Sequence, residues 1–107
     1  MMDAKATFIS TLIFTVNPND LLRFADQATK LVRSKSAAAP GFIESVVMAD
    51  ETKTQVLVVT QWESRHAWAQ VHWDQEVGNG IVALVESATK FDVRSYDPIA
   101  VIRRAKA

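Results

Sequence analysis

The sequence contains no cysteine, only three glycines and three prolines, and no excess of charge of either sign. Without cysteine, the chain cannot form disulfides, thiolate nucleophiles, zinc–thiolate centres or cysteine-bound iron–sulfur clusters. Twelve basic and twelve acidic residues give a formal net charge of zero. A neutral chain is poorly suited to unspecific nucleic-acid binding, which depends on neutralising phosphates. We therefore expect no nucleic-acid partner.

Long apolar runs are also missing. No stretch approaches the length of about 20 apolar residues that spans a bilayer, and Met1 to Lys5 lack the apolar segment of a secretory signal. These features predict a cytoplasmic protein with no membrane partner. The 107 residues, 49% of them hydrophobic, are enough for one domain over residues 1–107 with its own core.

The hydrophobic pattern predicts the order β-α-β-β-α-β. A β-branched and aromatic strand covers residues 6–16, and a helix begins at residues 17–20 and continues to about residue 34. Strands follow over 42–49 and 54–62, joined by a polar turn over 50–53. Ser64 is expected to cap a helix over 65–77, and Gly78-Asn79-Gly80 is expected to end it. A short helical stretch over 81–88 and a strand over 89–96 complete the chain.

This order is that of the α+β, ferredoxin-like βαββαβ fold, with one antiparallel sheet and its helices on one face. The first and third strands nevertheless carry apolar side chains on both faces. The face without helices needs a cover, and a second copy of the chain is the simplest one. We predict a homodimer whose sheets pack face to face as a dimeric α+β barrel. The alternative is a sheet face that remains in contact with solvent.

Two segments resemble the antibiotic biosynthesis monooxygenase family: Pro40-Gly41-Phe42, and residues 61–68, Gln-Trp-Glu-Ser-Arg-His-Ala-Trp. The resemblance implies a dimeric α+β barrel. The family includes cofactor-free oxygenases of quinols and polyketide anthrones, and also haem-degrading enzymes. A scaffold role is the alternative for these residues, because Ser64 is a good helix cap and Gly41 allows a tight turn.

The resemblance implies that Trp62 lies in a substrate pocket. Oxygenase-type relatives also have an asparagine four residues earlier and a hydroxylated aromatic residue six residues later. Here Val58 and Trp68 occupy those positions, so a different substrate or the absence of that reaction is expected. The haem-degrading pattern would place tryptophan and histidine where this chain has Val71 and Ile81. Haem degradation is therefore a distant third function.

The predicted second helix is rich in aromatic residues, with Trp68, His72 and Trp73 close together. Trp68 and His72 are separated by four residues and share a helix face. With Trp62, they could form a pocket in which His72 accepts a proton from a phenolic substrate. His66 is the second choice for this catalytic base. The alternative for His72 is a surface side chain paired with Glu76.

Arg94 and Tyr96 share one face of the last strand. They are candidates for substrate binding in a barrel dimer, and alternatives place them in solvent or at the dimer seam. Threonines at positions 7, 11, 15 and 60 are candidates to line a cavity, although threonine is also an ordinary strand former. No metal site is expected, because His66 and His72 do not share a helix face.

Two functions compete. The first is a cofactor-independent monooxygenase of a small aromatic, quinol-like or polyketide-type molecule, with His72, His66 and Trp62 as catalytic candidates. Its substrate-binding candidates are Trp62, Trp68, Arg94 and Tyr96, and no cofactor is expected. The second is a non-catalytic dimeric module that binds a hydrophobic metabolite. The two differ in whether a base reaches the pocket.

Overall fold

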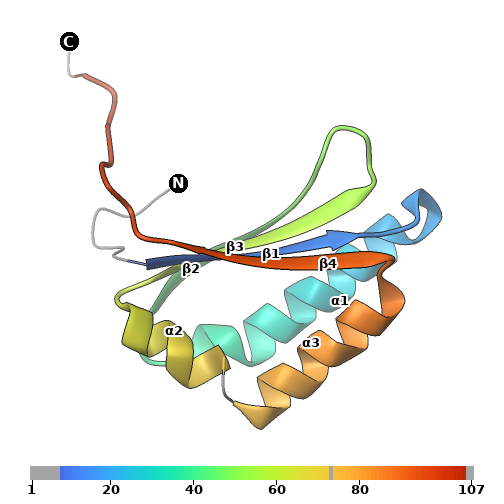
Figure 1. Cartoon of the computed structure of the whole chain (residues 1–107), viewed down its shortest axis with the longest axis horizontal. Helices are drawn as coiled ribbons and strands as arrows, with labels where there is room; N and C mark the ends of the chain where they lie inside the picture. Colours follow the sequence, from blue (N-terminus) through green and yellow to red (C-terminus); the bar gives the residue numbers. More distant parts are fainter. Residues whose placement is uncertain (1–7, 73, 106–107) are drawn as a thin grey trace.

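The computed structural model describes residues 8–72 and 74–105. Four antiparallel strands form one sheet in the order β2-β3-β1-β4. They are β1 (Phe8–Thr15), β2 (Phe42–Ala49), β3 (Gln55–Trp62) and β4 (Lys90–Tyr96). The helices α1 (Leu21–Ser34), α2 (Arg65–His72) and α3 (Gln75–Ser87) lie on one face of the sheet (Figure 1). This confirms the predicted α+β fold. Thr7 and Trp73 lie outside the described residues.

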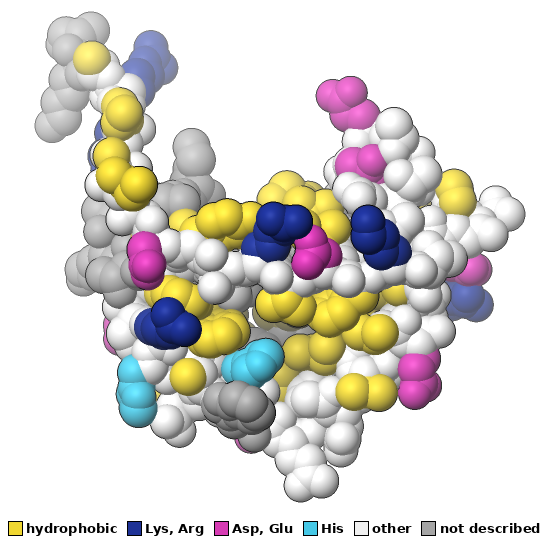
Figure 2. Space-filling view, in the orientation of Figure 1, with side chains coloured by type: hydrophobic (Ala, Val, Ile, Leu, Met, Phe, Trp, Pro, Cys, Tyr) yellow, Lys and Arg dark blue, Asp and Glu magenta, His cyan; other side chains and the backbone are white. Residues whose placement is uncertain are grey.

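The sheet is apolar on both faces. Strand registers place Phe8, Phe14 and Trp62 toward the helices, and Ile13, Leu57 and Val59 on the opposite face. We call this second face the open face, since no helix covers it (Figure 1). Figure 2 shows hydrophobic side chains on both sides of the edge strand β4. The apolar pattern on two faces, predicted from the sequence, is therefore present in the fold.

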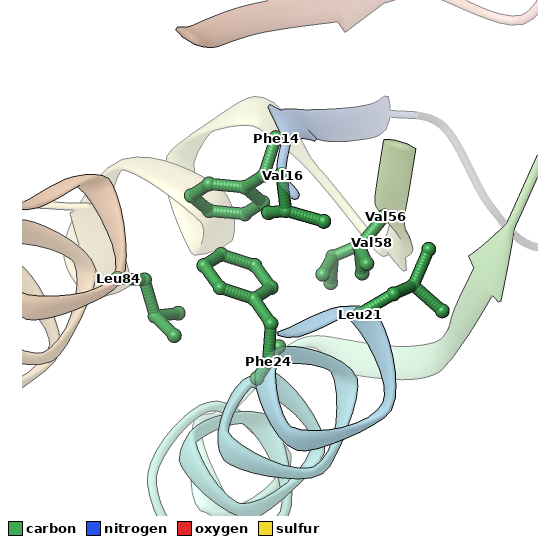
Figure 3. Close-up of a cluster of buried hydrophobic side chains, with 8 residues drawn as sticks. Phe14, Val16, Leu21, Phe24, Val56, Val58 and Leu84 are labelled. Atoms are coloured by element: carbon green, nitrogen blue, oxygen red, sulfur yellow. The ribbon is translucent and has the colours of Figure 1, made fainter. Parts of the chain in front are cut away.

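The main core lies between the sheet and the helices α1 and α3. Phe14 is fully buried and stacks on Phe91, with ring centroids 4.9 Å apart. Phe24 of α1 packs against Phe14 at the same distance, and Leu84 of α3 closes the cluster (Figure 3). A second cluster at the other end of the sheet is built on Phe8, Trp62, Val71 and Val77.

Asp50 organises the turn between β2 and β3. Its carboxylate accepts hydrogen bonds from the Thr52 hydroxyl and from the backbone N–H groups of Thr54 and Gln55. These bonds, that of Thr52 first, lower the pKa of Asp50 from 3.8 to about 2. The turn therefore carries an ionised carboxylate at neutral pH.

The prediction that residues 65–77 form one helix ended by Gly78-Asn79-Gly80 is wrong. Helix α2 ends at His72, and the three residues lie inside α3. Asp74 explains the new start, because its side chain accepts a hydrogen bond from the backbone N–H of Val77 at 3.0 Å. At Gly80, α3 approaches α1 closely, since a Cβ on this residue would lie only 2.5 Å from Leu31 Cδ1.

After α1, Ser36–Ala38 form a 3₁₀ turn, η2. A similar turn, η1 (Pro18–Asp20), precedes α1, and the Asn17 side chain caps η1 by accepting a hydrogen bond from the Asn19 N–H. Within residues 8–72 and 74–105, every helix is too short or too polar to cross a bilayer.

The two segments that carry the family resemblance pack on each other. Gly41 has a positive φ of 85°, and its carbonyl accepts a hydrogen bond from the Glu63 N–H at 2.8 Å. A Cβ on Gly41 would overlap the Cβ of Ala67. Ser64 caps α2 by accepting a hydrogen bond from the Ala67 N–H at 3.0 Å. Together these contacts set where α2 leaves the sheet.

Replacing Gly41 with alanine tests this junction. We expect Gly41→Ala to lower the free energy of unfolding by at least about 2 kcal/mol, since it adds a steric overlap to a left-handed backbone. Urea unfolding measures the loss. In the double variant Gly41→Ala/Ala67→Gly the overlap is removed, so stability should be partly restored relative to the sum of the two single changes. An unchanged urea midpoint for Gly41→Ala would contradict the assigned contact.

The two helical glycines of α3 should respond differently to alanine. A Cβ at Gly78 meets no atom within 4 Å, whereas one at Gly80 meets Leu31. Gly78→Ala should therefore stabilise the fold by about 0.5–1 kcal/mol through helix propensity. Gly80→Ala should gain less or lose stability, because Leu31 must move. Thermal unfolding of both variants gives the comparison, and equal Tm shifts would contradict the difference in packing.

Candidate functional site

A small cavity lies between the sheet and the helices, at the junction of the two core clusters. Its volume is about 50 Å³. Strands β1, β3 and β4 form one wall, and α2, α3 and the end of α1 form the other. It is lined by Ser10, Leu12, Val32, Ser36, Val58, Thr60, Trp62, Trp68, Val71, His72, Val77, Ile81 and Val93. The lining brings together both candidate tryptophans and one of the two candidate histidines.

Trp62 ends β3 and forms the inner wall of the cavity. Its side chain is 3% exposed and meets Phe42 edge-on, with ring centroids 5.6 Å apart. The indole N–H donates a hydrogen bond to the Ser10 hydroxyl at 3.0 Å. This bond holds the ring in one orientation and leaves the hydroxyl proton of Ser10 to be donated elsewhere.

Trp68 and His72 form the helical wall. Their rings stack with centroids 4.8 Å apart and planes 26° from parallel, as their spacing of four residues on α2 predicts. Trp68 also contacts Phe8 at 5.2 Å. His72 is exposed on its outer side while it lines the cavity. It therefore touches both solvent and the cavity, a position suited to passing a proton between them.

His66 lies elsewhere. It is exposed at the start of α2 and borders an outer hollow of about 440 Å³ with Gly41, Glu63 and Gln70. Its Nε2 lies 3.5 Å from Nε2 of Gln70. His66 is absent from the lining of the inner cavity, so the structure separates the two candidate bases.

The proposed pairing of His72 with Glu76 does not occur along one helix, because α2 ends at His72 and α3 begins at Gln75. The Glu76 carboxylate accepts a hydrogen bond from Lys35 Nζ at 2.6 Å. This contact raises the pKa of Lys35 above 10.5 and ties α3 to the segment after α1.

Arg94 and Tyr96 lie on the open face. Their register partners on β1 are Thr11 and Ile9, whose side chains point away from the helices. Arg94 Nε donates to Asp92 at 3.0 Å, and Tyr96 is half exposed. The sheet therefore separates both side chains from the cavity that holds Trp62 and His72.

Sequence analysis missed Ser10 and Ser36 as cavity residues. Ser10 is 6% exposed and lies on the otherwise apolar helix-facing side of β1. A single small polar residue among Phe8, Leu12 and Phe14 was the available signal. Thr60, named as a cavity candidate, does line the cavity, and its hydroxyl lies 2.9 Å from that of Ser45. Thr11 and Thr15 alternate onto the open face instead.

Larger hollows lie on the outer surface of the described part of the chain. One, of about 360 Å³, is bordered by Lys35, Pro40, Asp74, Glu76 and their neighbours. Among the described residues, none of those that border it is aromatic. It shares Val71 and Val77 with the inner cavity, so these two side chains form the partition between them. In the described part of the chain, no three histidine, aspartate or glutamate side chains cluster as metal ligands.

Solved structures of similar fold include several monooxygenases. A monooxygenase from the gene ActVA-Orf6 of Streptomyces coelicolor, in complex with nanaomycin D, is 21% identical over 96% of both chains, with a TM-score of 0.84. SnoaB, a cofactor-independent oxygenase from Streptomyces nogalater, is 12% identical, with a TM-score of 0.78. That match covers 92% of this chain and all of SnoaB. Rv0793 from Mycobacterium tuberculosis gives the same TM-score, identity and coverage.

A search of curated proteins finds no match. The family described as antibiotic biosynthesis monooxygenase matches residues 7–75. This segment runs from β1 to the start of α3 and includes both halves of the junction between Gly41 and Ala67, together with Trp62, Trp68 and His72. The chain belongs to the antibiotic biosynthesis monooxygenase family.

Proposed function

We propose that this chain is a cofactor-independent monooxygenase that oxidises a small phenolic, quinol-like or polyketide-type aromatic molecule. One observation carries the proposal: Trp62, Trp68 and His72 line the same cavity. Two indoles offer flat apolar surfaces for an aromatic ring. The imidazole of His72 supplies a proton acceptor, and histidine is the commonest general base in enzymes. The similar fold of SnoaB, a cofactor-independent oxygenase, is consistent with this chemistry.

The Ser10 hydroxyl lies at one end of the cavity, and the His72 imidazole lines another side. At the polar end, Ser10 accepts the Trp62 N–H, so its own proton can be donated to a substrate oxygen. At the other side, His72 is held against Trp68. A substrate bound between them would have its oxygen at Ser10 and its acidic proton at His72. Donation by Ser10 would stabilise the negative charge that forms when the proton leaves.

The reaction we propose converts an anthrone-type methylene group and O₂ into a ketone and water. His72 takes a proton from the substrate, and the resulting anion transfers one electron to O₂. The substrate radical and superoxide combine through a C–O bond and form a peroxide after protonation. Loss of the remaining C–H proton and cleavage of the O–O bond then give the carbonyl and water. The substrate is the reductant and O₂ the oxidant.

A cavity of about 50 Å³ is smaller than the several hundred Å³ of ordinary small-molecule sites. Binding of an aromatic substrate therefore requires the site to widen. Val71 and Val77 separate it from the outer hollow of about 360 Å³, and both belong to the elements that meet at the break between α2 and α3. A displacement at this break would join the two spaces.

A specific observation favours the second function, a binding module for a hydrophobic metabolite. Val58 lines the cavity with an apolar group where oxygenase-type relatives carry an asparagine. The hydroxyl of Thr60, which also lines the cavity, is hydrogen-bonded to the Ser45 hydroxyl. Such a module would bind the same aromatic molecules without consuming O₂, since binding requires stacking surfaces but no proton acceptor.

Oxygen uptake with hydroquinone and anthrone substrates tests the proposal. We expect His72→Gln to reduce kcat by about 10²–10⁴-fold, the usual contribution of a general base. The matched control is His66→Gln on the same helix, which should leave kcat unchanged because His66 borders a different hollow. Rates are taken above the background of spontaneous substrate oxidation in buffer.

Binding is measured in parallel through quenching of tryptophan fluorescence. If the wild-type protein binds the substrate and consumes no O₂, the binding module is correct and the monooxygenase is not. If His72→Gln retains full activity, His72 is not the base.

We also propose that the working unit is a homodimer that buries the open face of the sheet. The exposed apolar side chains Val46 and Met48 of β2 lie on this face beside half-buried Leu57 and Val59. A patch of this kind on a sheet that has no helix above it is typical of a protein interface. The two sheets would then pack face to face as in a closed barrel.

Substituting a charge into this face tests the dimer. Val46 is 37% exposed in the single chain, so Val46→Glu should change the fold little but weaken self-association by at least tenfold, because the carboxylate would be buried at the interface. Leu22→Glu is the control, since Leu22 is 82% exposed on α1, on the other side of the molecule. Sedimentation equilibrium gives both dimer constants. A monomeric wild-type chain would contradict the proposal.

A further inference from the structure

We propose that the hydroxyls of Ser10 and Thr60 form a paired site that recognises two oxygen atoms on one edge of an aromatic molecule. The inference rests on the proposed function and narrows its substrate class to aromatic rings that carry at least two oxygens along one edge. Both side chains line the cavity beside Trp62, and they are only 6% and 5% exposed. We call Ser10 and Thr60 the hydroxyl pair.

The register of the sheet creates the pair. Strands β1 and β3 are the two central strands (Figure 1), and Ser10 lies directly opposite Thr60. The other helix-facing side chains of these two strands are apolar or aromatic: Phe8, Leu12, Phe14, Val56, Val58 and Trp62. Each strand therefore places one hydroxyl on this face, and both hydroxyls fall at the same register. Opposite Cβ atoms in such a ladder are about 5 Å apart.

Each hydroxyl keeps an unused capacity for hydrogen bonding. Ser10 accepts the Trp62 N–H at 3.0 Å, so its own proton can be donated to a ligand. The Thr60 hydroxyl lies 2.9 Å from that of Ser45, and either of the two can be the donor. If Thr60 donates, its oxygen can accept from a ligand, and if it accepts, its proton can be donated. The pair therefore suits two ligand oxygens, whether hydroxyl or carbonyl.

Two contacts on the sheet would fix the orientation of a ring in its own plane, whereas one contact would leave it free to pivot. The hydroxyl pair lies on the sheet wall of the cavity, and His72 lies on the helical wall. A ring held by two oxygens would thus present the same edge to His72 each time it binds. Val58 and Trp68 stand where oxygenase-type relatives carry an asparagine and a hydroxylated aromatic residue, so the hydroxyl pair would recognise oxygens from different positions.

The spacing of the pair does not depend on the widening proposed above. That displacement concerns the break between α2 and α3, which belongs to the helical wall. Ser10 and Thr60 instead lie on central strands, each of which is hydrogen-bonded to a neighbour on both sides. The sheet therefore holds the two hydroxyls in place before a ligand arrives, which favours selective binding.

Titration calorimetry under nitrogen with three small aromatic probes tests the pair. The probes are 2,3-dihydroxynaphthalene, 2,6-dihydroxynaphthalene and 2-naphthol, and only the first has two oxygens on one edge. We expect the wild-type chain to bind it about three- to tenfold more tightly than the other two, the usual contribution of one additional hydrogen bond. Thr60→Val keeps the shape of the side chain and should abolish this preference. Thr60→Ser keeps the hydroxyl and should retain the preference.

The matched control is Ser95→Ala. Ser95 is the register neighbour of Ser10 on the edge strand β4, but it is exposed and is not among the residues that line the cavity. This variant should show the wild-type preference. A purely structural effect of Thr60→Val would weaken the binding of all three probes alike, so the ratio of their Kd values is the deciding quantity. Equal Kd values in the wild-type chain, no binding of any probe, or a preference that survives Thr60→Val would overturn the hydroxyl pair.

Oxygen uptake with the hydroquinone and anthrone substrates separates this inference from the proposed function. A preference for 2,3-dihydroxynaphthalene that Thr60→Val abolishes, without consumption of O₂, would support the hydroxyl pair and overturn the monooxygenase. Consumption of O₂ that depends on His72, without any preference among the three probes, would support the monooxygenase and overturn the hydroxyl pair.

Discussion

The contact between Gly41 and Ala67 determines where the rest of the site can lie. With no side chain on Gly41, α2 starts against the turn that enters β2, and the hydrogen bond from Glu63 to Gly41 closes the junction. Trp62 is the last residue of β3 before this junction. The direction of α2 then brings Trp68 and His72 back over the sheet. The two segments that carry the family resemblance therefore build the scaffold and the candidate site together. The close approach of α2, which requires glycine at position 41, also orients the aromatic side chains of α2.

The cavity results from incomplete packing between two cores. Phe14 and Phe24 fill one end of the helix layer, and Phe8 and Trp62 fill the other. The helix break near Asp74 separates α2 from α3, so no single helix covers the space between these clusters. Polar side chains in this space hydrogen-bond to each other, as the Trp62 indole N–H does to the Ser10 hydroxyl. The proposed binding of an aromatic molecule in so small a space would depend on movement of its helical wall.

The sheet gives the molecule two unequal faces. On one, helices bury Phe14 and Trp62 almost completely. On the other, apolar side chains of β2 and β3 remain partly in water, and the segment after β4, which leaves the sheet on this side (Figure 1), carries the exposed Ile99 and Ile102. Hydrophobic burial favours covering both features, and one partner copy can do so. The cavity lies on the helix side and the proposed interface on the other, so the proposed catalysis and the proposed assembly would use different surfaces of the same sheet.

Periodicity in the sequence was sufficient to determine the order of elements, the buried face of α1 and the two-sided sheet, because these depend on alternation and on local caps such as Asn17 and Ser64. It also placed Trp68 and His72 on one face of α2. Only the tertiary structure decided that Gly78 and Gly80 belong to a helix, since the packing of α3 on α1 and the cap at Asp74 outweigh glycine's poor helix propensity. The tertiary structure also separated His66 from the cavity and placed Arg94 and Tyr96 on the open face of the sheet. It showed, in addition, that Ser10 accepts a hydrogen bond from Trp62. Those outcomes depend on distances between segments remote in the chain, which no local pattern encodes.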